Sequence, residues 1–162
     1  MRETRPIRLL FVCLGNICRS PMAECVFEYL VKGRNDLSHS YEVDSAGIAG
    51  YHIGDLPDVR MREAAWQRGY KMTSRARQVG FEDFETFDLI IGMDDANIDA
   101  LKEMAPDVES LGKIVKMTDY CIHMEADHVP DPYYGGTAGF YYVIDLLEDA
   151  CQGLLDSLEK QD

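Results

Sequence analysis

A thiol and a guanidinium group lie close together near the start of the sequence, in the segment FVCLGNICRSPMAE at residues 11–24. Cys13 comes at the end of the first apolar run, and Arg19 follows six positions later. A cysteine thiolate is a strong nucleophile, and the planar guanidinium group of arginine binds two oxygens of a phosphate group at once. We therefore interpret this pair as a nucleophile and a phosphate-binding group that act on a bound phosphate ester.

The segment between these two residues has the features of an anion-binding loop. Residues 7–13 are a continuous apolar run, as in a strand buried on both faces, and Ser20-Pro21 is typical of a helix start with Ser20 as the N-cap. Such a loop directs several backbone N–H groups at one point. The nucleotide-binding motifs of this position, G-x-x-x-x-G-K-S/T and G-x-G-x-x-G, are absent. The expected phosphate contacts come from consecutive residues: Leu14, Gly15, Asn16, Ile17, Cys18 and Arg19.

Strand-like and helix-like segments alternate along the whole chain. Further strands are predicted at 41–46, 87–93 and 113–117, and helices at about 20–31, 57–69, 94–105 and 137–160. Repeated strand–helix units predict an α/β fold: a single three-layer domain over residues 1–162, with a four-stranded parallel sheet, helices on both faces and the phosphate-binding loop after the first strand. The loops that follow parallel strands gather at one edge of the sheet, where ligands bind.

Composition and charge exclude several classes of function. The net charge of -13 argues against nucleic acid and against an anionic membrane surface, since both need a basic partner. No segment is long and apolar enough to span a bilayer, and the polar first residues lead into no signal-type apolar region. The 5 cysteines are odd in number and lack the spacing of a disulfide framework, which indicates thiols in a reducing compartment. We expect a cytoplasmic protein, with a monomer as the default.

The segment at residues 11–24 resembles the signature of the low-molecular-weight protein tyrosine phosphatases. The similarity continues in order through VDSAG at 43–47, RQV at 77–79, FD at 87–88 and DPYYG at 131–135, so it covers nearly the whole chain. The resemblance implies an enzyme that hydrolyses phosphotyrosine monoesters through a phosphocysteine intermediate. It also implies that tyrosine-phosphorylated proteins are the substrates and that no metal or cofactor takes part.

The same resemblance implies roles for residues outside the loop. Asp131 of the DPYYG stretch is implied as the general acid, which protonates the leaving phenolate and then, as a carboxylate, takes a proton from the hydrolytic water. Tyr133 and Tyr134 are implied as walls of the cleft, with Tyr51 as the opposite wall. Ile17 is expected to contact the aromatic ring of the substrate.

Polar groups within and behind the loop are expected to support it. Asn16 can hold a left-handed backbone conformation in this tight loop, and the Ser20 hydroxyl can donate to the thiolate and help it to leave. The resemblance implies a supporting network through Asn16, Ser20 and Ser45. Many relatives add a histidine to this network where the present chain has Ser74.

Cys18 has two interpretations. It fills space in the core, or it forms a reversible disulfide with Cys13 that protects the nucleophile from over-oxidation, as the resemblance implies.

Two alternatives share the expected fold. Protein-arginine phosphatases resemble this sequence but tend to carry Thr at the position of Ile17, and a branched apolar residue there favours phosphotyrosine. Arsenate reductases use a similar cysteine–arginine loop but need a second cysteine pair near one flexible segment. Cys121 and Cys151 are 30 residues apart, and Cys151 falls on a helix stripe, so this alternative is weak.

A third alternative belongs to a different class of protein. Four potential metal ligands occur together, at Cys121, His123, Asp127 and His128. They share no helix face and have no recognised ligand spacing, so a solvated loop is the favoured interpretation and no metal site is predicted. A non-catalytic phosphate-binding domain is the last alternative, and the joint presence of nucleophile, arginine and acid argues against it.

Overall fold

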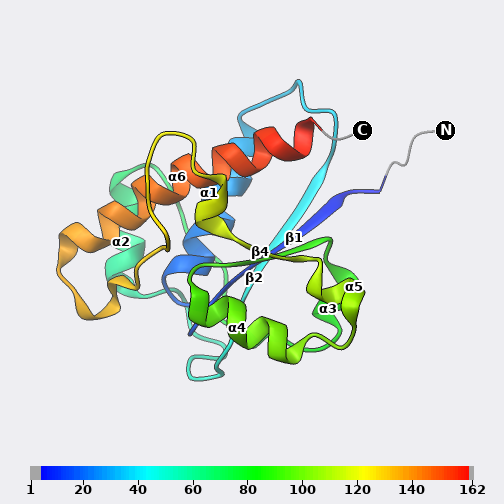
Figure 1. The fold of residues 1–162 in the computed structure, drawn as a ribbon. Coiled ribbons are helices and arrows are strands. Elements are labelled where there is room, and N and C mark those ends of the chain that lie inside the picture. The colour runs from blue at the N-terminus through cyan, green and yellow to red at the C-terminus, as the bar shows by residue number, and fades with distance from the viewer. Residues whose placement is uncertain (1–4, 161–162) are drawn as a thin grey trace.

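The computed structural model describes residues 5–160 and shows a four-stranded parallel sheet with helices on both faces (Figure 1). The spatial order of the strands is β2-β1-β3-β4. Their bounds are Ile7–Cys13 for β1, Tyr41–Gly47 for β2, Leu89–Gly92 for β3 and Ile114–Lys116 for β4. The predicted fold class is therefore confirmed, and β1, which ends at Cys13, lies in the interior of the sheet between β2 and β3.

The helices form two layers. Their bounds are Arg19–Lys32 for α1, Val59–Gln67 for α2, Asp83–Thr86 for α3, Asp95–Met104 for α4, Val108–Leu111 for α5 and Thr137–Glu159 for α6, with 3-10 turns η1 at Met117–Tyr120 and η2 at Pro132–Tyr134. Figure 1 shows α1, α2 and α6 on one side of the sheet and α3, α4 and α5 on the other. None of the helices in the described part of the chain combines the length and hydropathy needed to cross a membrane.

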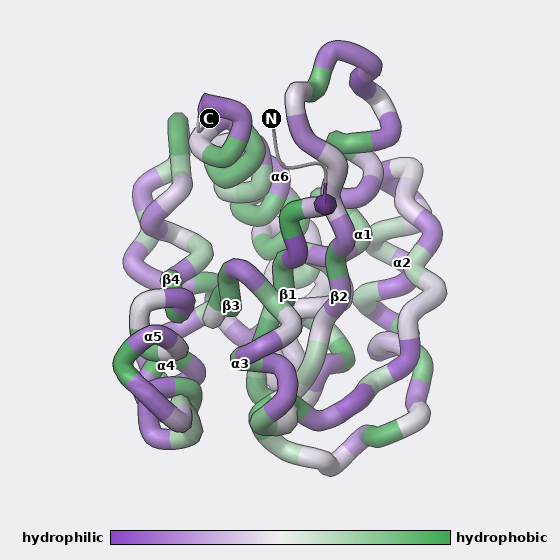
Figure 2. Tube along the Cα trace, turned by 90° about the vertical axis from the view of Figure 1, so that its right-hand side faces the viewer, coloured by the Kyte–Doolittle hydropathy of each residue, from purple (hydrophilic) through white to green (hydrophobic). Residues whose placement is uncertain are grey.

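The side chains of β1 divide between two hydrophobic cores, because successive residues of a strand point to opposite faces. Leu9 and Phe11 pack in the larger core with α1, α2 and α6, whereas Leu10 and Val12 pack in the smaller core with α3 and α4. In Figure 2, hydrophobic residues are frequent along α6 and along the strands. Burial on both faces fixes β1 firmly, and the loop that follows it starts from a rigid base.

Several predicted boundaries are wrong in detail. Ser20 is not the N-cap of α1, because the helix begins at Arg19 after Cys18 and no side chain caps it. The helix predicted from residue 57 begins at Val59, since the carboxylate of Asp58 accepts from the backbone N–H of Arg60. The strands predicted at 87–93 and 113–117 are shorter, and α3 and α5 were not predicted. A helix of one turn leaves no periodic pattern in a sequence.

Candidate active site

A hollow at the carboxyl edge of the sheet collects residues from segments that are distant in the sequence. It has a volume of about 180 Å³ and is lined by Cys13, Leu14, Gly15, Ile17, Cys18, Arg19, Tyr51, His52, Asp131, Tyr133 and Tyr134. The structure therefore brings the predicted nucleophile, arginine, acid and cleft walls to one place. This is the arrangement expected when the loops after parallel strands share one edge.

The loop after β1 is held in a tight conformation by its own asparagine. Asn16 has a φ of 58°, which confirms the predicted left-handed conformation. Its side-chain Nδ2 donates to Ser20 Oγ at 2.8 Å, and its Oδ1 accepts from the backbone N–H of Arg77 at 3.0 Å. Arg77 is itself fixed, because its guanidinium contacts the carboxylates of Asp44 and Asp83. The loop is thus tied to a segment about 60 residues further along the chain.

The end of β2 lies directly against the same loop. The backbone N–H groups of Ile48 and Ala49 donate to the carbonyl oxygens of Cys13 and Leu14, each at 2.9 Å. A side chain at Gly47 would place its Cβ only 3.0 Å from the Leu14 carbonyl oxygen. Glycine suits this position, because a Cβ would crowd three backbone atoms and force a small shift of the phosphate-binding loop against β2.

The Cys13 thiol faces the Ser20 hydroxyl. The distance between Sγ and Oγ is 3.0 Å, and both residues are buried. The Ser20 oxygen accepts from Asn16, and its single proton can be donated either to the Cys13 sulfur or to the Ala46 carbonyl oxygen. The Cys13 sulfur is closer than the other available acceptor, the Ala46 carbonyl oxygen at 3.4 Å. This geometry suits donation to a thiolate.

Arg19 is buried and is held by one edge of its guanidinium group. Nη1 donates to Asp94 at 2.6 Å and to the Val129 carbonyl oxygen at 3.0 Å. Nε is buried without a partner, and Nη2 is 3.7 Å from an Asp131 oxygen, which is beyond hydrogen-bond distance. The Nε–Nη2 edge is therefore available for two phosphoryl oxygens. Burial opposes the positive charge, but the charge of Cys13 and the hydrogen bond to Asp94 raise the pKa of Arg19.

Asp94 orients this arginine and was not predicted as a site residue. The sequence places it only at the start of the helix predicted at 94–105, and in the structure it caps α4 by accepting from the backbone N–H of Asn97 at 2.8 Å. Its second carboxylate oxygen binds Arg19. The one available signal is its position immediately beyond β3, at the ligand-binding edge of the sheet.

Asp131 lies at the opening of the hollow with its two carboxylate oxygens in different surroundings. One oxygen accepts from the backbone N–H of Tyr133 at 3.0 Å and so caps the η2 turn. The other oxygen is the one that lies 3.7 Å from Arg19 Nη2. The residue is exposed, so its carboxyl group is accessible both to a ligand in the hollow and to water.

Aromatic and apolar side chains form the walls of the hollow. Tyr51 and Tyr134 are 75% and 91% exposed, and this exposure leaves both rings free to stack on a ligand. Tyr133 is less exposed and meets Tyr134 edge to face, with ring centroids 5.0 Å apart. Ile17 is half-buried and also lines the hollow. His52 lines it as well; its imidazole lies against Gly15 and was not identified from the sequence.

Ser45 differs from the prediction. Its hydroxyl donates to the carboxylate of Glu24 on α1 at 2.6 Å rather than to Asn16 or Ser20. Glu24 lies four positions after Ser20, about one helical turn further along α1, and the Ser45 hydroxyl contacts the helix at that turn. Burial raises the pKa of Glu24 to about 7, and the hydrogen bond from Ser45 opposes this shift. The contact that holds Asn16 is instead made by the backbone of Arg77, three residues after Ser74.

Of the other four cysteines, only Cys18 lines the hollow. Within the described residues all five cysteines are free thiols. Cys18 is buried, and this burial, together with the negative charges of Asp58 and Cys13, raises its pKa. Cys151 is buried in the core, and neither it nor Cys121 lines the hollow. The second cysteine pair required of an arsenate reductase is therefore not at the site.

The candidate metal ligands at residues 121–128 are not gathered into one cluster. In residues 5–160, no three His, Cys, Asp or Glu side chains lie in an arrangement that could hold a metal ion. The loop is instead anchored by Asp149 of α6, whose carboxylate accepts from the backbone N–H groups of Ile122, His123 and Met124. His128 pairs with its neighbour Asp127 at 2.6 Å.

The fold and the hollow together define an α/β protein whose first strand presents a cysteine and an arginine around an anion-binding loop. The family model described as low molecular weight phosphotyrosine protein phosphatase matches residues 8–162, and the chain belongs to this family.

Individual relatives agree with this assignment. The low molecular weight protein-tyrosine-phosphatase YfkJ of Bacillus subtilis is 42% identical over 156 residues, which cover 96% of this chain and 97% of the relative. A crystal structure of a protein tyrosine phosphatase from Entamoeba histolytica has a TM-score of 0.91 at 47% identity and covers 95% of this chain and 97% of that one. The crystal structure of DARP, a Drosophila arginine phosphatase, has a TM-score of 0.88 at 33% identity and covers 96% and 100%.

Proposed function

We propose that the protein hydrolyses phosphotyrosine in protein substrates through a phosphocysteine intermediate formed on Cys13. The observation that carries this proposal is the arrangement around the buried Arg19. One edge of its guanidinium group is fixed by Asp94 and Val129, and the other edge is available for a phosphate beside the Cys13 sulfur.

In the first step, the Cys13 thiolate attacks the phosphorus atom. A sulfur–phosphorus bond forms, and the bond between phosphorus and the tyrosine oxygen breaks. Asp131, in its protonated form, gives its proton to the leaving phenolate. Arg19 and the N–H groups of the loop stabilise the charge that spreads over the phosphoryl oxygens. These donors are already fixed before the substrate arrives, so little reorganisation is needed.

In the second step, water replaces the thiolate on phosphorus. The Asp131 carboxylate takes a proton from the water molecule as its oxygen bonds to phosphorus, and the bond to sulfur breaks. Inorganic phosphate and the Cys13 thiolate are the products. The Ser20 hydroxyl, 3.0 Å from the sulfur, stabilises the departing thiolate by donating its proton in a hydrogen bond. Side chains and backbone groups supply every part of this scheme, so it needs no metal or cofactor.

The aromatic walls support phosphotyrosine as the substrate. A phenyl phosphate is long enough to place its phosphate in the loop while its ring lies between Tyr51 and the Tyr133–Tyr134 pair. Ile17 adds an apolar contact to the ring and offers no polar partner to a phosphoguanidine. Phosphoarginine remains the second candidate, because one structural relative is named as an arginine phosphatase.

We also propose that Cys18 protects the nucleophile during oxidation. A peroxide would convert the Cys13 thiolate to a sulfenic acid, and attack by the Cys18 sulfur would then form a disulfide and release water. A small dithiol would reduce this disulfide. Replacement of Cys18 by serine is then expected to prevent recovery of activity by dithiol after peroxide treatment. Equal recovery in the variant and the wild type would contradict the protective role.

We further propose that residues 1–162 act as one monomeric domain in the cytoplasm. The free state of all five described cysteines supports a reducing compartment. Analytical ultracentrifugation at micromolar concentration tests whether the protein is a monomer.

The test of the function compares phosphotyrosine and phosphoarginine peptides of the same sequence, in EDTA, with Cys13→Ser as the control. We expect turnover of phosphotyrosine that persists in EDTA and disappears in the variant. Preferential turnover of phosphoarginine would contradict the proposed substrate but would leave the proposed mechanism intact. Turnover that survives in Cys13→Ser would reject the mechanism.

A further inference from the structure

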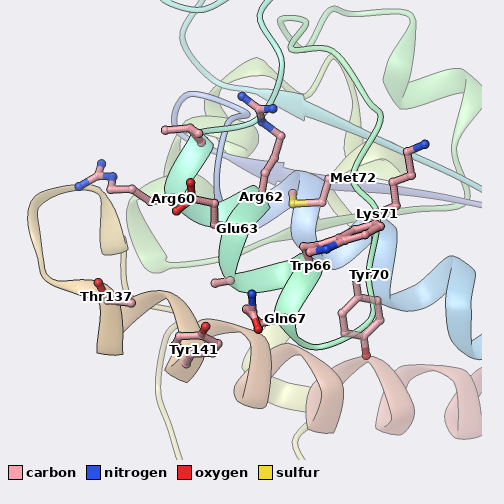
Figure 3. Close-up of a pocket in the computed structure, with 12 residues that line it drawn as sticks. Arg60, Arg62, Glu63, Trp66, Gln67, Tyr70, Lys71, Met72, Thr137 and Tyr141 are labelled. Carbon is pink, nitrogen blue, oxygen red and sulfur yellow. The ribbon is translucent and has the colours of Figure 1, made fainter.

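A second hollow lies on the surface between α2 and α6. It has a volume of about 830 Å³ and is open to solvent along α2. Figure 3 shows Arg60 at one end and Lys71 at the other, with Arg62 and Trp66 between them. We call this hollow the α2–α6 groove. It contains none of the residues assigned to catalysis.

The groove holds positive charges that are not neutralised. Every described arginine except Arg62 and Arg75 lies within 4.0 Å of a carboxylate oxygen, as expected in a chain with a net charge of -13. Arg62 donates only to the Pro57 carbonyl oxygen, and within residues 5–160 no carboxylate pairs with Lys71. The groove also contains Glu63, which does not balance these cations.

An exposed tryptophan lies among these charges. Trp66 is the only tryptophan of the chain, and its side chain is 66% exposed on α2. A large aromatic group that makes little contact with the protein itself is common where a partner binds, because its burial in a complex contributes strongly to affinity. The α2–α6 groove therefore combines an apolar contact point with two cations that lack acidic partners.

The groove is continuous with the candidate active site through one contact. The guanidinium of Arg60 donates to the Tyr133 carbonyl oxygen at 2.9 Å and lies 5.2 Å from the centre of the Tyr133 ring. Tyr133 lines the hollow that contains Cys13. A peptide whose phosphotyrosine enters that hollow can pass over Tyr133 and reach the α2–α6 groove.

We propose that the α2–α6 groove binds an acidic segment of the phosphoprotein substrate that lies next to the phosphotyrosine. Carboxylates of this segment pair with Arg62 and Lys71, and an apolar side chain packs on Trp66. A nucleic acid or an anionic membrane does not fit, because two local cations on a strongly acidic protein cannot offset repulsion from a large anionic surface. This inference rests on the proposed function for the source of the peptide, but binding to the groove needs no catalysis.

The catalytic arm of the test uses two phosphotyrosine peptides of equal length. The first peptide carries a leucine and three glutamates next to the phosphotyrosine, and the second carries glutamines in place of the glutamates. Each peptide is made in two versions, with this segment before or after the phosphotyrosine. For the wild type at low salt we expect kcat/KM to be about tenfold higher with glutamates, mostly through KM. The double variant Arg62→Glu/Lys71→Glu is expected to lose this preference while turning over free phosphotyrosine normally.

A matched control separates the groove from net charge. The double variant Lys102→Glu/Lys160→Glu changes the charge by the same amount, but both lysines lie outside the groove. It is expected to keep most of the preference for glutamates. An equal loss in both double variants, or no preference for glutamates in either peptide arrangement, would overturn the proposal.

The binding arm uses the fluorescence of Trp66, which reports on the groove alone. The probe is the glutamate peptide with phenylalanine in place of phosphotyrosine, so no turnover occurs. We expect a saturable change in emission that weakens with added salt and is absent in Arg62→Glu/Lys71→Glu. No change in the wild type would reject docking in the groove, even if phosphotyrosine turnover is normal. Binding without any turnover would instead reject the proposed function.

Discussion

The catalytic hollow and the α2–α6 groove use arginine in opposite ways. Arg19 is buried, is fixed by Asp94 and Val129, and presents one free edge toward the Cys13 sulfur. Arg62 is held only by a backbone carbonyl and has no carboxylate partner. A group that must stabilise charge in a transition state needs to be immobile and removed from water. A group that only attracts a peptide can stay mobile and hydrated, and its contribution to the free energy of binding is then smaller.

The largest expected effect separates these two arginines. Arg19→Lys loses the planar pair of donors, and kcat for p-nitrophenyl phosphate is expected to fall by about 10³-fold. Arg62→Lys keeps the charge of a half-buried residue that lies outside the catalytic hollow, and it is expected to change kcat by less than about twofold. Steady-state kinetics of the two variants measure this difference. Similar effects at both positions would show that the contrast between the two hollows is wrong.

A smaller effect is expected at the proposed general acid. Asp131→Asn is expected to lower kcat by about 10²-fold for phenyl phosphate, whose leaving group needs a proton. The loss should be smaller in the phosphorylation step with p-nitrophenyl phosphate, because nitrophenolate leaves without protonation. Burst kinetics measure that step separately. An equal loss of the phosphorylation rate with both leaving groups would argue against protonation by Asp131.

Two serines sharpen the comparison within the catalytic region. Ser20→Ala is expected to lower kcat by about tenfold, because its hydroxyl lies 3.0 Å from the Cys13 sulfur. Ser45→Ala is expected to change kcat by no more than about twofold, since its hydroxyl donates to Glu24 instead. If Ser45→Ala were as damaging as Ser20→Ala, Ser45 would belong to the loop-supporting network after all.

The smallest effect on turnover is expected at Glu24, which acts on stability. Its pKa is about 7 in the folded protein, above the 4.5 expected when unfolded, so the folded state binds the extra proton. We therefore compare the free energy of unfolding of the wild type with that of Glu24→Gln. The difference between them is expected to shift against the wild type by roughly 3 kcal/mol as pH rises from about 4.5 to 7, and to stay level above pH 7. Urea unfolding at several pH values measures this. A difference that stays constant with pH would contradict the assigned burial effect.

The sequence allowed the catalytic loop to be predicted because its signals are local. Cys13 and Arg19 flank a junction between an apolar run and a helix start, and Asn16 lies between them. The same local rules misassigned Ser20 as a helix cap. Its hydroxyl is engaged by Asn16 and faces Cys13, and a capping pattern carries no information on such partners.

Contacts between distant segments could not be predicted in this way. Arg77 supports Asn16 through a backbone N–H group, which any residue type could supply. Asp94 stands at the start of a predicted helix, and its contact with Arg19 depends on β3 lying next to β1. The α2–α6 groove depends on how two helices pack, so neither Arg62 nor Trp66 stands out in the sequence alone.

The most direct test of the account is to trap the intermediate on Cys13. Asp131→Asn, mixed with p-nitrophenyl phosphate and quenched in acid within milliseconds, should form the phosphoenzyme faster than water can remove it. We expect mass spectrometry to find one phosphoryl group, on the peptide that contains Cys13, and none in Cys13→Ser. A phosphoryl group on another residue, or nitrophenolate release without any phosphoenzyme, would contradict the central claim.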